Sequence, residues 1–96
     1  MHYYALFYDV VDNFADKRLP FREHHLRLAQ EAHARGEVVL AGALADPADR
    51  ALLVFRAVDK TVVENFVNQD PYVTKGLVAR WEIRPWTVVI GNQPEK

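Results

Sequence analysis

The sequence has 96 residues, a length typical of one small domain with a modest core. Lysine and arginine number 12 against 13 acidic residues, a formal net charge of -1, and they form no basic run, so nucleic acid is not an expected partner. No apolar stretch approaches the roughly 20 residues of a membrane-spanning helix, and the N-terminus has no signal-peptide pattern. We therefore expect a cytoplasmic protein with no membrane partner.

The residue inventory restricts the chemistry. The chain contains no Cys and no Ser, which excludes disulfides and the usual covalent nucleophiles. Histidine, acidic residues, Tyr, Lys and Arg remain, and this set suits proton transfer. The histidines, His2, His24, His25 and His33, do not have the spacing of a metal-ligand cluster, and the glycines do not have a phosphate-binding spacing. The sequence therefore predicts no metal and no cofactor.

The first half of the chain begins with an aromatic-rich strand over Tyr3–Tyr8, apolar on both faces. A polar loop containing Asp12 and Asn13 follows. The pattern then predicts a helix over Pro20–Arg35, with proline in the first turn, where it is tolerated, and Gly36 at the end.

The second half begins with a hairpin, formed by strands over Val38–Leu44 and Ala51–Phe55. Asp59 is a suitable N-cap for a short helix that ends near residue 68. A last strand is predicted over Leu77–Ile90, with Pro85 expected to bend or interrupt it. The chain reads as one domain over residues 1–96, with a loose tail after residue 91.

This β-α-β-β-α-β order predicts an α+β, ferredoxin-like fold, in which both helices cover one face of a four-stranded antiparallel sheet. The other face is then uncovered. Because the first three strands are apolar on both sides, that face would expose a large apolar patch in a monomer. We therefore expect a homodimer, or a larger assembly, in which a second copy packs sheet against sheet.

His25 lies inside the apolar arc of the first predicted helix, among Phe21, Ala29 and Ala32. A buried imidazole without a hydrogen-bond partner costs about 1–3 kcal/mol, so His25 needs a partner. A core histidine satisfied by a backbone carbonyl or water is one interpretation, and a functional histidine is the other. His24 falls at the edge of the arc, and it is expected, like His33, to be solvated or half-exposed.

Four other residues are candidates for the same site. Arg22 also falls inside the arc, where its guanidinium would bind an anionic substrate or pair with an acidic residue. Asp70, which precedes Pro71, fits an N-cap that starts a helical turn, but it is also an acidic partner for a histidine. Tyr72 and Trp81 would form an aromatic pocket wall, or else belong to the core or an interface.

Four motifs together resemble the YciI-like (YCII) family in order and spacing, from about residue 3 to residue 91. They are Arg22-x-x-His25-Leu26, Leu40-Ala41-Gly42, Asp70-Pro71-Tyr72 with Gly76-Leu77, and Ile83-Arg84-Pro85-Trp86. The resemblance implies a dimeric α/β barrel in which His25 and Asp70 form a catalytic dyad. The family usually has proline after the second-strand Ala-Gly pair, and Ala43 stands there in this chain.

The resemblance also implies an activity, because one reaction assigned within this family is the dehydrochlorination of a chlorinated hydroxyhydroquinone. Such a lyase would use His25 as base and Asp70 to orient it, with Arg22, Tyr72 and Trp81 binding a small aromatic or acidic substrate. An isomerase or another lyase would use the same pair. A non-catalytic binding protein would use it for structure, and a regulatory oligomerisation module would be expected to carry further segments.

Overall fold

The computed structural model of the protein describes residues 1–91 and 94. The loose tail predicted after residue 91 therefore lies mostly outside the described residues. The elements, in chain order, are β1 (His2–Val10), α1 (Phe14–Lys17), the 3₁₀ helix η1 (Leu19–Phe21), α2 (Arg22–Ala34), β2 (Val38–Ala43), β3 (Arg50–Ala57), α3 (Lys60–Gln69), α4 (Pro71–Thr74) and β4 (Val78–Trp86).

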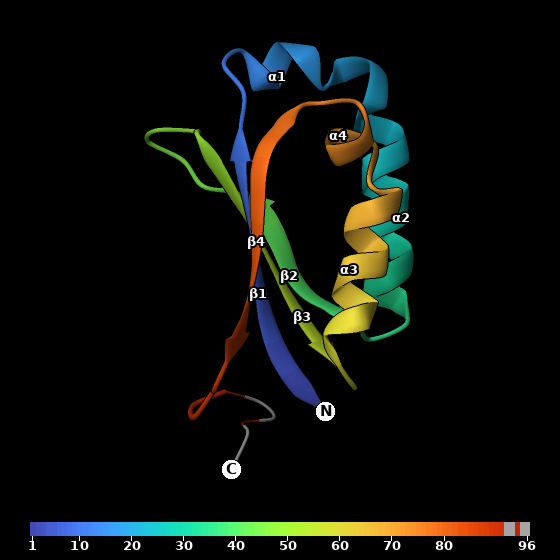
Figure 1. The fold of residues 1–96 in the computed structure, drawn as a ribbon, viewed down its shortest axis with the longest axis vertical. Helices are drawn as coiled ribbons and strands as arrows, with labels where there is room; N and C mark the ends of the chain where they lie inside the picture. Colours follow the sequence, from blue (N-terminus) through green and yellow to red (C-terminus); the bar gives the residue numbers. More distant parts are fainter. Residues whose placement is uncertain (92–93, 95–96) are drawn as a thin grey trace.

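The strands form one antiparallel sheet in the order β2-β3-β1-β4. Figure 1 shows α2, α3 and α4 on one side of this sheet and no helix on the other side. This arrangement confirms the α+β, ferredoxin-like fold and the hairpin of β2 and β3. The two central strands, β3 and β1, lie under the helical layer, and β2 and β4 form the edges.

The core lies between the sheet and the helices. Alternate residues of β1 point toward the helices, and Leu6, which is fully buried, lies opposite Leu53 of β3 and Ile83 of β4. From the helical layer, Val63 and Val67 of α3 are also fully buried. Each such side chain contributes about 1.5–3 kcal/mol on burial, so the inner face of the sheet fixes the strand register.

Capping residues set the helix ends as the sequence predicts. The carboxylate of Asp59 accepts the backbone N–H of Thr61 at 2.9 Å and begins α3. Gly36, with φ of +81°, follows the end of α2 in the left-handed conformation that glycine adopts without strain. The prediction therefore located these boundaries to within a residue or two.

Two predicted segments differ from the structure. The polar loop after β1 contains a short helix, α1, which begins after Asn13 in the left-handed conformation (φ 60°) that asparagine tolerates. Pro85 does not interrupt the last strand, since it pairs opposite Tyr4 without a register shift, although β4 ends at Trp86 rather than near residue 90. An edge strand accommodates proline because one side of its backbone makes no ladder hydrogen bonds.

The outer face of the sheet is partly covered by the chain's own arginines. The guanidinium of Arg50 lies 5.0 Å from the ring centroid of Phe7, a cation–π contact. Leu40 and Trp86, by contrast, are 69% and 46% exposed. Apolar side chains thus remain exposed on this face, and the homodimer stays a prediction. Among the described residues, no helix is long and apolar enough to cross a membrane.

Candidate active site

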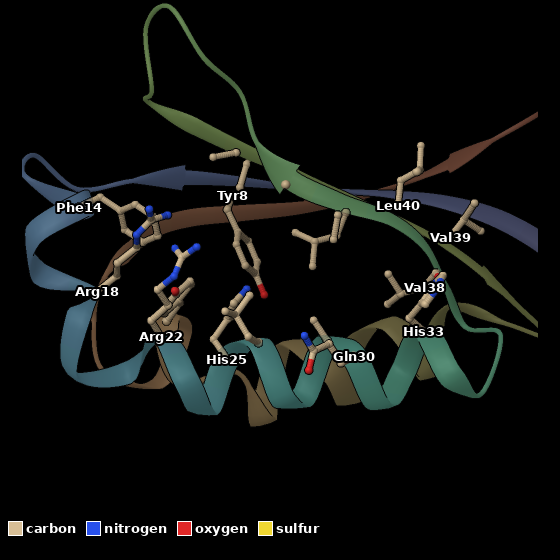
Figure 2. A pocket seen from close by; sticks show the side chains of 18 residues that line it. Tyr8, Phe14, Arg18, Arg22, His25, Gln30, His33, Val38, Val39 and Leu40 are labelled. Atoms are coloured by element: carbon tan, nitrogen blue, oxygen red, sulfur yellow. The ribbon is translucent and has the colours of Figure 1, made fainter.

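A pocket of about 470 Å³ lies between α2 and the half of the sheet that contains β2. Figure 2 shows Arg18, Arg22 and His25 reaching from the helical layer toward the sheet at one end of this pocket. Tyr8 extends down from β1 toward His25. The pocket thus combines cationic and titratable side chains with the apolar residues of β2.

The packing of α2 places His25 at the pocket wall. Ala29 and Ala32, four and seven residues further along the helix, are buried against the sheet on the same face. The side chain of His25 is 13% exposed, whereas His24 and His33 are exposed. The predicted orientation of all three histidines is therefore confirmed. His33 Nδ1 also lies 2.7 Å from the carbonyl oxygen of Val38.

Asp70 is fully buried at the junction of α3 and α4. Its Oδ1 accepts the backbone N–H of Tyr72 at 3.0 Å, and Pro71 occupies the first position of α4. Asp70 is thus an N-cap, as its position before proline predicts. Because the cap holds the carboxylate in one orientation, its other acceptor positions can make a second contact of fixed geometry.

The second contact joins Asp70 to His25, whose Nδ1 lies 2.8 Å from Asp70 Oδ1. The other carboxylate oxygen, Oδ2, accepts the hydroxyl of Tyr8 at 2.8 Å. A buried carboxylate is costly unless it is hydrogen-bonded, and donors from β1, α2 and α4 meet this need together. The sheet and the helical layer are therefore joined at a single carboxylate.

Tyr8 is a donor to this carboxylate at every physiological pH. Burial of the phenol raises the pKa of Tyr8 far above its ordinary value, and the negative charge of Asp70 raises the pKa further. Tyr8 therefore donates to Oδ2, as the N–H of Tyr72 donates to Oδ1, and Asp70 acts as a hydrogen-bond acceptor toward both. We assign the proton of His25 to Nδ1 on this basis, which leaves Nε2 with the lone pair that can accept a proton.

The ring of Tyr72 packs against the face of the His25 imidazole. The two rings are stacked, with centroids 3.9 Å apart and planes 12° from parallel, and Phe14 contacts Tyr72 edge to face at 5.1 Å. An oriented acceptor nitrogen at the wall of a pocket can move a proton to or from a bound molecule. Within residues 1–91 and 94, no three His, Cys, Asp or Glu side chains come together as a metal site requires.

The structure brings four of the five predicted site residues together: His25, Asp70, Arg22 and Tyr72. Trp81 does not join them. It belongs to β4, at the sheet edge opposite β2, and lines a separate pocket of about 250 Å³. Trp81 is the cross-strand partner of Tyr8, but it does not line the pocket that contains His25.

Two residues of the site were not predicted. Tyr8 was hidden in an apolar strand, although a buried phenol requires a partner, and its position two residues from Leu6 places it on the inner face. Arg18 precedes the predicted helix, and the structure places it between α1 and η1, where it lines the same pocket as Arg22. No sequence pattern marked it.

The fold and the site together define the class of the protein: a ferredoxin-like α+β domain with a histidine–aspartate pair at a small pocket. The chain belongs to the YCII-related domain family, which matches residues 1–87. This match confirms the resemblance to YciI-like proteins. No curated protein matches the chain.

Solved structures are similar to the chain over most of its length. One is 5-chloro-2-hydroxyhydroquinone dehydrochlorinase from Burkholderia phenoliruptrix AC1100 in complex with 2,5-dihydroxybenzoquinone, with a TM-score of 0.76 and 17% identity over 91% of this chain and 95% of that one. Another is a NIPSNAP family protein from Agrobacterium tumefaciens strain C58, with a TM-score of 0.60 and 9% identity over 91% of both chains. The protein Atu4242 from Agrobacterium tumefaciens has a TM-score of 0.54 and 10% identity over 93% of this chain and 94% of that one. At these identities the likeness establishes the fold.

Proposed function

We propose that the protein is a cofactor-independent lyase that removes HCl from a chlorinated hydroxyhydroquinone, with His25 as the base and Asp70 as the residue that orients it. The observation that carries the proposal is the 2.8 Å contact between His25 Nδ1 and the buried Asp70 carboxylate, at the wall of a pocket. Membership of the YCII-related family and the similarity to a dehydrochlorinase support the choice of reaction.

The reaction needs only proton transfers and loss of chloride. A hydroxyl proton first moves to the ring carbon that carries chlorine, which gives a ketone tautomer. Loss of a second hydroxyl proton then expels chloride and leaves a hydroxyquinone. The substrate loses one proton and one chloride ion, and the carbon–chlorine bond is replaced by carbon–hydrogen, so no external oxidant is required. A base that first accepts and then returns a proton serves both steps.

The pocket suits such a substrate. Its volume of about 470 Å³ lies in the range of small-ligand sites, and the apolar part of its lining suits an aromatic ring. Arg22 and Tyr72 are proposed to contact substrate oxygens, since both line the pocket beside His25. Asp70 does not contact the substrate and acts through His25.

We further propose that the protein works in the cytoplasm as a homodimer, with the uncovered face of the sheet as the interface. The exposed side chains of Leu40 and Trp86 support this surface. Sedimentation of the protein at two concentrations tests the assembly, and a mass of about one chain at both would contradict it.

A non-catalytic binding protein is the second candidate, because Asp70 already has a structural role as the N-cap of α4. In that case the contact with His25 would stabilise the fold alone. Another lyase or an isomerase would share the catalytic site and differ only in substrate.

The test is chloride release and quinone absorbance with a panel of chlorinated hydroquinones, comparing wild type with His25→Ala and Asp70→Asn. A dehydrochlorinase releases one chloride for each quinone formed, and both variants lose most of this turnover while remaining folded by circular dichroism. Wild type that turns over no member of the panel would contradict the proposed reaction.

A further inference from the structure

The lining of the pocket has an imbalance of charge. Arg18 and Arg22 both line the pocket, and among its described lining residues none is Asp or Glu. Asp70 lies behind His25, where the imidazole and Tyr8 occupy its oxygens. An entering molecule therefore meets two guanidinium groups and no fixed negative charge.

Four other arginines have carboxylate partners, whereas Arg56, whose Nε also lacks a hydrogen-bond partner, lies over the ring of Tyr3 away from this pocket. Arg27 and Arg35 pair with glutamates on the surface, and Arg50 and Arg80 pair with Asp9. Within the described part of the chain, neither Arg18 nor Arg22 forms an ion pair, and the Nε of Arg18 is sealed from solvent without a hydrogen-bond partner. An arginine without an anionic partner beside a pocket has its binding capacity available for a ligand.

Tyr72 adds a second unpartnered polar group. Tyr72 is only 4% exposed, and its hydroxyl makes no hydrogen bond of good geometry, although Arg22 lies near enough to act on it as a weak donor and so to lower its pKa. Burial raises the pKa of Tyr72, and the charges of Arg18 and Arg22 oppose part of this increase. The hydroxyl is thus a protonated donor beside two cations.

We propose that Arg18 and Arg22, with the hydroxyl of Tyr72, form an oxyanion-binding subsite that holds an ionised oxygen of the substrate, a phenolate or a carboxylate, beside His25. Guanidinium groups bind planar oxyanions through paired N–H donors, and the phenol supplies one more. Apolar residues of β2 and β3, such as Ala41 and Leu53, line the pocket farther along, where they suit a ring. The substrate class is therefore a small cyclic molecule with one anionic oxygen.

The subsite rests on the proposed function only in taking this pocket as the place where substrate binds. Its fixed positive charge would also favour the ionised form of a bound phenol, which is the form that takes up a proton at the ring carbon in the first step. Arg18 and Arg22 are then substrate-binding residues, and their effect is measurable without turnover.

The experiment measures binding of three probes to the intact protein by calorimetry, with 4-nitrophenol also followed by the absorbance of its phenolate. Benzoate tests a carboxylate, 4-nitrophenol tests a phenolate, and nitrobenzene is the neutral reference. In wild type, at least one anionic probe binds more tightly than nitrobenzene, and bound 4-nitrophenol ionises at a lower pH than free 4-nitrophenol.

Arg18→Gln and Arg22→Gln each weaken binding of that anionic probe by about tenfold or more and leave nitrobenzene unaffected. The matched control is Arg27→Gln, which removes an exposed arginine of α2 that pairs with Glu23 outside the pocket, and it leaves all three affinities unchanged. Tyr72→Phe weakens the anionic probe without lowering stability, because the hydroxyl has no partner to lose.

Equal binding of neutral and anionic probes, or anion binding that survives both arginine substitutions, would overturn the subsite. Either result leaves the proposed lyase untouched if chloride release is still seen. Arginine-dependent anion binding with no turnover would support the subsite and contradict the lyase, so the two failures are distinguishable.

Discussion

His25 Nδ1 lies 2.8 Å from Asp70 Oδ1, although 45 residues separate the two in the chain. The same oxygen caps α4 by accepting the N–H of Tyr72, and the other oxygen accepts the hydroxyl of Tyr8. The position of the imidazole is therefore determined by a helix cap and by a strand. The effect of these contacts on protein stability and their effect on activity can be tested separately.

Asp70→Asn separates orientation from capping. The amide oxygen still accepts the N–H of Tyr72, but the amide no longer stabilises a proton on His25 as a carboxylate does. We expect turnover to fall by about 10²- to 10⁴-fold with a small change in stability. The measurement is the initial rate of chloride release.

The control for that substitution is Asp59→Asn, since Asp59 is also an N-cap but begins α3 on the surface. It is expected to retain full activity. Equal activity losses in the two variants would indicate a general effect of weakened capping, and the orienting role of Asp70 would then be wrong.

Two buried tyrosines give opposite predictions for the same substitution. Tyr8→Phe removes the donor to Asp70 Oδ2 and leaves a buried carboxylate oxygen unpaired, so the free energy of unfolding falls by about 1–3 kcal/mol. Tyr72→Phe removes a hydroxyl without a partner, so stability stays unchanged or increases. Urea unfolding of both variants measures the difference, and a larger loss for Tyr72→Phe would contradict the hydrogen-bond roles given to the two hydroxyls.

The sequence predicted most of the scaffold because local signals there agree. Apolar spacing in α2 placed His25 on the inner face, and Asp59 and Gly36 marked helix ends through capping and backbone freedom. The prediction was less accurate for the segment after β1. The polar residues around Asn13 suggested a loop, but a left-handed residue there starts the short helix α1.

The site itself could be predicted only in part. Helix phase orients His25 and a cap explains Asp70, but their contact depends on how α2 packs against α4, and only the family resemblance suggested it. Strand alternation places Tyr8 on the inner face, but nothing local identifies the partner of its hydroxyl, because a tyrosine in an apolar strand also fits the core. Trp81 was assigned to the pocket on residue type, but it lines the second pocket.

Alkaline pH should destabilise the protein through Tyr8. Its phenol ionises near pH 10.0 when unfolded, whereas burial and Asp70 raise its pKa in the folded state. Above pH 10 the folded state therefore binds more protons than the unfolded state, and the free energy of unfolding falls by about 1.4 kcal/mol per pH unit from this group. In Tyr8→Phe the slope above pH 10 should be shallower, and identical slopes would contradict the assignment.

Acid should weaken the contribution of Asp9 to the stability of the fold. Hydrogen bonds from Arg80 and Arg50 hold the pKa of Asp9 below its ordinary value of 3.8. The stabilisation is present above that value and is lost as the pH falls through the lowered pKa. Wild type should therefore be more stable than Asp9→Asn at neutral pH, and the two should converge in acid. Parallel curves for wild type and Asp9→Asn across this pH range would contradict the prediction.

Chemical rescue of His25→Ala with free imidazole, measured as chloride release from a chlorinated hydroxyhydroquinone, tests the role of His25 most directly. If His25 is the base, the variant loses about 10²- to 10⁴-fold in rate, and added imidazole restores part of it in proportion to its concentration. A His25→Ala variant that releases chloride at the wild-type rate would show that His25 is not the base.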